Sequence, residues 1–284
     1  MSKRLVFLAW LLLSFASTID GQQAIRSIPV TDTLTTTAPI QTEEEEFIKP
    51  SRPSLANPAE IQKAGVLQLE LGYDANLRSQ EFHSEQTVPL ALRYAASDRL
   101  LLEADLDIVK SETEETGVRA TGIGDTRLGL QVVSLKDTKE HPALAFAYYL
   151  KLPSASTRKG LGTGRVDHKF VALISKKVGQ IDMDLNGAVL VVGREHADGW
   201  ITGGQGALSF AGQFENGFGL QGELSGQTKD DVQPKGLYAL GAVTYKVNRR
   251  LVFDAGARFG LNPDAPRVGF FTGLTVGVAD LHKK

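Results

Sequence analysis

Val66-Leu67-Gln68-Leu69-Glu70-Leu71-Gly72-Tyr73-Asp74 alternates apolar and polar side chains with a period of two. In an extended strand this period places the leucines and Tyr73 on one face, and Gln68, Glu70 and Asp74 on the other. A helical period of 3.6 would scatter the acids around a cylinder. The stretch therefore predicts a strand with one apolar and one polar face.

The same alternation recurs along the chain. It is clear at 88–94, 100–108, 127–132, 144–152, 181–191, 218–225 and 251–259, and weaker at 168–176, 201–212, 236–246 and 268–279, so we expect about twelve strands. Short turns such as 96–99 alternate with longer polar loops such as 110–124 and 153–167. Short turns at one end and long loops at the other are typical of outer-membrane barrels.

Whether the polar face of each strand points into the barrel or out to solvent decides between a membrane barrel and a soluble barrel. A soluble barrel puts its apolar face inside, whereas a membrane barrel turns that face to lipid and keeps a polar lumen. About twelve strands, a polar face rich in charges and an export signal favour the membrane. We therefore predict an all-β, antiparallel, up-and-down transmembrane β-barrel, with a soluble exported β-barrel as the alternative.

The N-terminal part predicts export. Lys3 and Arg4 precede a short apolar run and small residues, so 1–21 has the pattern of a signal peptide, and the run is too short for a spanning helix. Residues 22–60 are rich in Thr, Glu and Pro, which predicts a disordered periplasmic segment. Residues 61–284 are assigned to the barrel.

Composition excludes several classes. The 284 residues carry a formal charge of −2, which argues against a nucleic-acid binder, and the absence of Cys excludes disulfides and thiolate metal sites. A mean hydropathy of −0.11 with one long apolar run excludes a bundle of transmembrane helices. The glycine runs at 122–124 and 160–164 lack the strand–helix context of a phosphate loop.

No catalytic or metal motif is present in the sequence. The five His residues are scattered without metal-ligand spacing, so we expect no metal, no cofactor and no enzyme activity. One enzyme alternative stays open: His168 with Ser154 or Ser156 could form a hydrolase site at the loop rim.

Several short motifs, in order, carry a family resemblance. Ser51-Arg52-Pro53 with 65–73, the hairpin 90–100, Gly122-Ile123-Gly124-Asp125 and Lys151-Leu152-Pro153 with 160–164 resemble the MetA-pathway-of-phenol-degradation family. The resemblance covers about 50–280. It implies an outer-membrane β-barrel transporter, held in outer-membrane lipid and inserted by the barrel assembly machinery. Two departures are Ser154-Ala155, where the family has Thr-Gly, and a C-terminus without an aromatic residue.

The functional hypothesis is passive passage of small molecules through a narrow charged lumen, and the family's name suggests aromatic or hydrophobic compounds. The alternative is an inert structural barrel in which the charges pair and fill the lumen. The residues we expect to line the pore are Glu70, Arg93, Glu103, Asp105, Asp107, Arg127, Lys151, Asp182, Asp184, Glu223, Asp254 and Arg258.

Overall fold

The computed structural model describes residues 46–80, 82–194, 198–228 and 235–282. These residues form thirteen strands and one short 3-10 turn, η1 (Thr157–Lys159). The strands are β1 (Val66–Leu77), β2 (Ser84–Ala95), β3 (Leu100–Thr113), β4 (Arg119–Gly122), β5 (Thr126–Leu135), β6 (Ala143–Leu152), β7 (Asp167–Val178), β8 (Ile181–Gly193), β9 (Trp200–Gln213), β10 (Phe218–Gln227), β11 (Gly236–Asn248), β12 (Leu251–Gly260) and β13 (Val268–Asp280).

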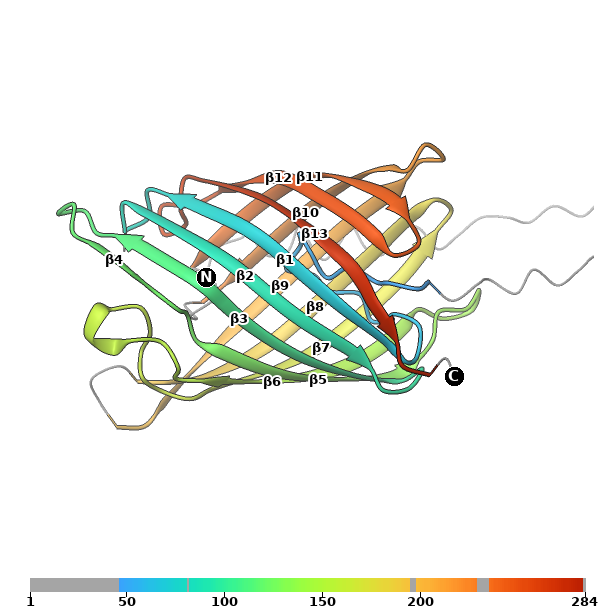
Figure 1. Ribbon diagram of the computed structural model, residues 1–284, viewed down its shortest axis with the longest axis horizontal. Coiled ribbons are helices and arrows are strands. Elements are labelled where there is room, and N and C mark those ends of the chain that lie inside the picture. Colours follow the sequence, from blue (N-terminus) through green and yellow to red (C-terminus); the bar gives the residue numbers. More distant parts are fainter. Residues whose placement is uncertain (1–45, 81, 195–197, 229–234, 283–284) are drawn as a thin grey trace, which may run out of the picture. The chain divides into compact units, whose positions relative to one another are not determined.

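The strands form one closed antiparallel barrel (Figure 1). Apart from β4 and β5, strands adjacent in the chain pair with each other, and β1 closes the wall by pairing with β13 from Val66↔Asp280 to Leu77↔Val268. Both β4 and β5 pair with β3, so these two strands occupy one position in the wall. Thirteen strands with one shared position give twelve barrel strands, which confirms the predicted architecture.

The shared position differs from the sequence prediction. Residues 110–124 were expected to form a loop, whereas β3 continues to Thr113 and pairs there with β4. The interruption between β4 and β5 lies where the Gly124 amide donates to the Asp107 carbonyl at 2.8 Å. The end of β3 therefore has a paired strand on each side, β2 to Ser84↔Thr113 and β4 to Thr113↔Arg119.

The two faces of the wall have the predicted chemistry. The side chains of Leu102, Phe146 and Phe253 point outward and are 44%, 52% and 43% exposed, whereas those of Glu70 and Arg93 point inward and are at most 1% exposed. An apolar exterior is stable only against another apolar phase, which for a closed barrel of this size is the hydrocarbon of a bilayer. No helix in the described part of the chain is long and apolar enough to cross a membrane.

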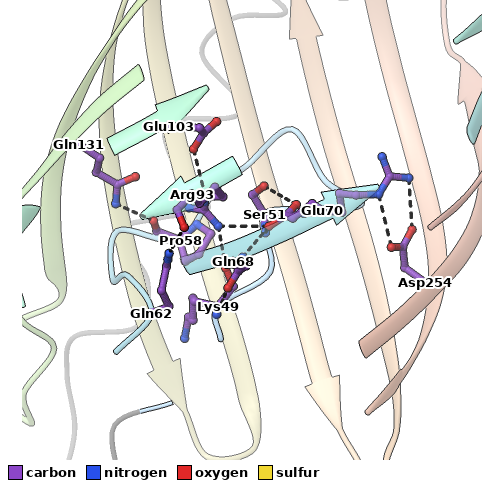
Figure 2. A network of polar contacts seen from close by, with 11 residues as sticks. Lys49, Ser51, Pro58, Gln62, Gln68, Glu70, Arg93, Glu103, Gln131 and Asp254 are labelled. Carbon is purple, nitrogen blue, oxygen red and sulfur yellow. Dashed lines mark hydrogen bonds and ion pairs between the residues drawn. The ribbon is translucent and has the colours of Figure 1, made fainter. Parts of the chain in front are cut away.

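The N-terminal region differs from expectation in part. Residues 1–45, including the predicted signal peptide, lie outside the described residues. Residues 46–60 were expected to be disordered, but with the following residues to Ala64 they are placed inside the barrel, bonded to inward-facing side chains of the wall (Figure 2). We call residues 46–64 the plug segment. The composition of this segment is too polar to form a hydrophobic core of its own. Contacts with side chains of distant strands hold it in place instead.

Candidate functional site

The centre of the lumen network is Arg93 on β2, whose side chain is completely buried (Figure 2). Its Nε lies 3.0 Å from Glu103 Oε2 and its Nη1 lies 3.3 Å from Glu70 Oε1. Nη1 also donates to the carbonyl of Lys49 in the plug segment at 2.7 Å. A buried guanidinium is tolerated only with such partners, so Arg93 joins β1, β3 and the plug segment.

Two wall carboxylates hold the backbone of the plug segment. Glu70 accepts hydrogen bonds from the Ser51 amide at 2.9 Å and the Ser51 hydroxyl at 2.8 Å. Farther around the wall, Glu223 Oε2 on β10 accepts from the amides of Leu55 and Ala56 at 2.7 and 2.8 Å. Because the plug segment is not part of a sheet, these side chains satisfy backbone donors that would otherwise be buried without partners.

Polar neutral side chains complete the attachment. The side chain of Asn186 on β8 both donates to the Asn57 carbonyl and accepts from its amide at 2.9 Å. The Gln131 amide group on β5 donates to the carbonyls of Pro58 and Ala59 at 3.1 and 3.0 Å. The plug segment is thus bonded around the circumference of the lumen.

Arg52 extends from the plug segment toward β1 and β12. Its guanidinium lies 3.4 Å from Asp254 on β12 and 3.5 Å from Asp74 on β1. Gly72 and Gly273 leave room for it, since a Cβ added to either would lie 2.3 or 2.6 Å from a guanidinium atom. Gly72 thus accommodates the arginine side chain, and Gly273 accommodates both this side chain and the Leu71 carbonyl oxygen, which would lie 2.7 Å from an added Cβ.

A cavity of about 230 Å³ lies beside the plug segment. Charged residues of both signs line it, with Asp105 paired to Arg127 at 3.4 Å and Lys151 paired to Asp125 at 3.6 Å. Leu161, from the loop between β6 and β7, is buried and also lines it. The volume corresponds to about eight water molecules or a small solute, at roughly 30 Å³ for each water.

The predicted lumen residues divide into three groups. Residues that line the cavity are Glu70, Glu103, Asp105, Asp107, Arg127, Lys151 and Arg258. Residues that are buried in the polar network outside the cavity lining are Arg93, Asp184, Glu223 and Asp254. Asp182 is half-buried at the start of β8 and is apart from both groups.

Sequence reasoning missed several charged residues around the cavity. Glu85, Lys110, Asp125 and Lys169 line it but were not among the predicted pore residues. They lie near strand ends, where the alternation fades. Asp74 was on the predicted polar face of the first strand, and its position opposite an apolar row was the signal that could have added it.

The hydrolase alternative requires a Ser–His pair. His168 Nδ1 lies 2.8 Å from the Tyr148 hydroxyl, and its ring packs against Trp200. The Ser154 hydroxyl bonds instead to Thr126 at 2.9 Å, and the contacts of the described residues include no hydrogen bond from Ser154 or Ser156 to His168. The same part of the chain contains no group of three His, Asp or Glu placed to hold a metal ion.

A closed wall with an apolar exterior and a charged interior defines the class of transmembrane β-barrels. A family model described as "Putative MetA-pathway of phenol degradation" matches residues 52–277, so the chain belongs to that family and the resemblance is confirmed. No curated protein matches the chain.

Solved structures share the fold. The COG4313 outer membrane channel from Pseudomonas putida F1 superposes with a TM-score of 0.62 at 14% identity, covering 77% of this chain and 97% of the other. A KdgM porin in complex with disordered oligogalacturonate gives a TM-score of 0.50 at 7% identity, covering 75% and 99%. At these identities the likeness is one of architecture.

Proposed function

We propose that this protein is a non-enzymatic outer-membrane channel for passive passage of small molecules through its charged lumen. The observation that carries the proposal is the cavity lined by Asp105, Asp107, Arg127 and Lys151 inside a barrel with an apolar exterior. Charges of opposite sign on adjacent strands impose a field across the opening, which selects solutes by charge and size.

The plug segment gives this channel a closed state. Its backbone is bonded to Glu70, Asn186 and Glu223 on separate parts of the wall, so passage requires it to shift or leave. These bonds are polar, and Phe47, Ile48 and Ala59 add apolar contacts with the wall. Small aromatic compounds, which the family description suggests, are the first solutes to test after simple ions.

The test is planar-bilayer recording of the purified full chain. We expect discrete channel events, with a reversal potential that shifts toward anion preference when Asp105→Asn and Asp107→Asn are combined. Glu140→Gln is the matched control, since it neutralises an exposed acid in the β5–β6 connection, away from the cavity.

The inert-barrel alternative predicts a different record. It requires no events from the wild type and none from Glu223→Ala, in which the plug segment loses an attachment. That result would overturn the channel proposal, whereas events in the variant alone would identify a channel closed by its plug segment.

A further inference from the structure

A second hollow lies away from the lumen network, among the connections at the loop end of the barrel. It has a volume of about 720 Å³ and is lined by the β1–β2 connection, the tip after β3 and the β12–β13 connection. Arg78, Ser79 and His83 come from the first connection, and Asn262 and Arg267 from the last. None of these residues takes part in the network that holds the plug segment.

The charges in this groove are unbalanced. Arg78 and Arg267 are exposed, and the described residues form no ion pair with either guanidinium. Glu115 is the single carboxylate among the described lining residues. The nearby Asp264 lies 3.3 Å from Lys235 and accepts from the Asn262 amide group. Arginine is always charged at physiological pH, so the groove presents two cationic forks toward solvent.

The backbone holds the two arginines together. The Arg267 amide donates to the carbonyls of Leu77 and Arg78 at 3.0 and 3.2 Å, and the Arg78 amide donates to the His83 carbonyl at 2.9 Å. Phe82 and Ala265 are buried and anchor the two connections. The backbone at both arginines is therefore fixed before a ligand binds, which lowers the conformational entropy lost on binding.

Arg78 has an unusual conformation. Its φ of 58° is the one positive φ at a non-glycine residue among the described residues. Side chains other than Gly, Asn and Asp rarely adopt this left-handed region, and strained residues cluster at ligand sites. Asn or Gly would adopt this backbone conformation at a lower energy. The turn itself therefore does not explain why the residue at position 78 is an arginine.

We propose that this groove is a binding site for an oxyanion, a phosphate group held between Arg78 and Arg267 with the Asn262 amide group as a neutral partner. Arginine forks match the spacing of phosphate oxygens and form charge-assisted hydrogen bonds. At the loop end of an outer-membrane barrel, the phosphate belongs either to a soluble molecule or to a lipid headgroup of the outer leaflet.

The experiment measures phosphate binding to the full chain by calorimetry in detergent. The variants are Arg78→Asn, which suits the left-handed backbone, Arg267→Gln and their combination. Arg158→Gln is the matched control, because Arg158 is an exposed arginine of the β6–β7 connection and does not line the groove. Slower migration after boiling than before verifies that each barrel is folded.

The second arm places the same proteins in phosphatidylcholine nanodiscs with or without phosphatidic acid, and native mass spectrometry counts the retained lipid. We expect each single variant to weaken binding about tenfold, as for one charged hydrogen bond, with Arg158→Gln unchanged. Loss of inorganic phosphate binding identifies a soluble ligand, and loss of phosphatidic acid retention alone identifies a lipid. Equal binding by the wild type and the double variant in both arms overturns the proposal.

Discussion

Glu223→Ala tests whether the plug segment is held by the wall contacts that the structure shows. The change removes the acceptor of the Leu55 and Ala56 amides, which lie 2.7 and 2.8 Å from Glu223 Oε2. Hydrogen bonds to a charged group contribute about 1.5–3 kcal/mol each, so the docked state loses about 3 kcal/mol even at the lower figure. At 1.4 kcal/mol per factor of ten, the undocked population rises about 100-fold.

The absence of native Cys makes this population measurable. Ala56→Cys introduces one thiol at a site that is 0% exposed, and a maleimide labels it only after the plug segment moves. We expect labelling to be about 100-fold faster in Glu223→Ala than in the parent, by the population shift above.

Two controls make the comparison specific. Asp107→Asn neutralises a cavity-lining carboxylate without a contact to the plug segment, so labelling at Ala56→Cys is expected to stay at the parent rate. Thr116→Cys, at the exposed tip after β3, is expected to label rapidly in every background. Equal labelling rates in Glu223→Ala and the parent would refute the argument that this carboxylate holds the plug segment.

Three further predictions concern stability. Arg93→Met leaves Glu70 and Glu103 without their buried cation, so the barrel is expected to lose about 3–5 kcal/mol in urea titrations, with Arg158→Met unchanged. Phe146→Arg places a charge on the apolar exterior and is expected to cost about 2–4 kcal/mol for folding into lipid vesicles; a cost near zero would contradict a lipid-facing Phe146. Partial burial raises the pKa of Asp137, but hydrogen bonds from Lys176 and the Lys177 amide lower it by more, so the pKa lies below its ordinary value. This contact therefore stabilises the fold above the unfolded pKa of about 3.9 and is lost as the pH falls through the lower folded value; Asp137→Asn is expected to flatten that acid limb, seen by urea midpoints.

The architecture could be predicted because a barrel strand is a local pattern. Leu102, Phe146 and Phe253 lie in the apolar rows of the alternating stretches 100–108, 144–152 and 251–259, and the strands pair almost entirely in chain order. The same alternation put Asp105 and Arg127 on the polar face. That they lie directly opposite each other on β3 and β5 is known only from the register in the structure.

The plug segment could not be predicted because its order depends on partners far away in the chain. Ser51 bonds to Glu70 at a separation of 19 residues, Asn57 to Asn186 at 129, and Ala56 to Glu223 at 167. The sequence pattern of a Pro- and Glu-rich stretch does not indicate contacts with residues so far away in the chain. The missed cavity residues depend on strand pairing, since Asp125 and Lys169 come near Lys151 only when β5, β6 and β7 are paired in register.

The attachment of the plug segment also sets an order of assembly. Glu70, Asn186 and Glu223 belong to β1, β8 and β10, so their carboxylate and amide groups surround residues 46–64 only after most of the sheet has formed. Contacts between distant parts of a chain form late, because loop closure must come first. We therefore expect the N-terminal segment to become ordered after the strands that surround it, although it is synthesised before them, and its protection from protease would report that β1, β8 and β10 are in place.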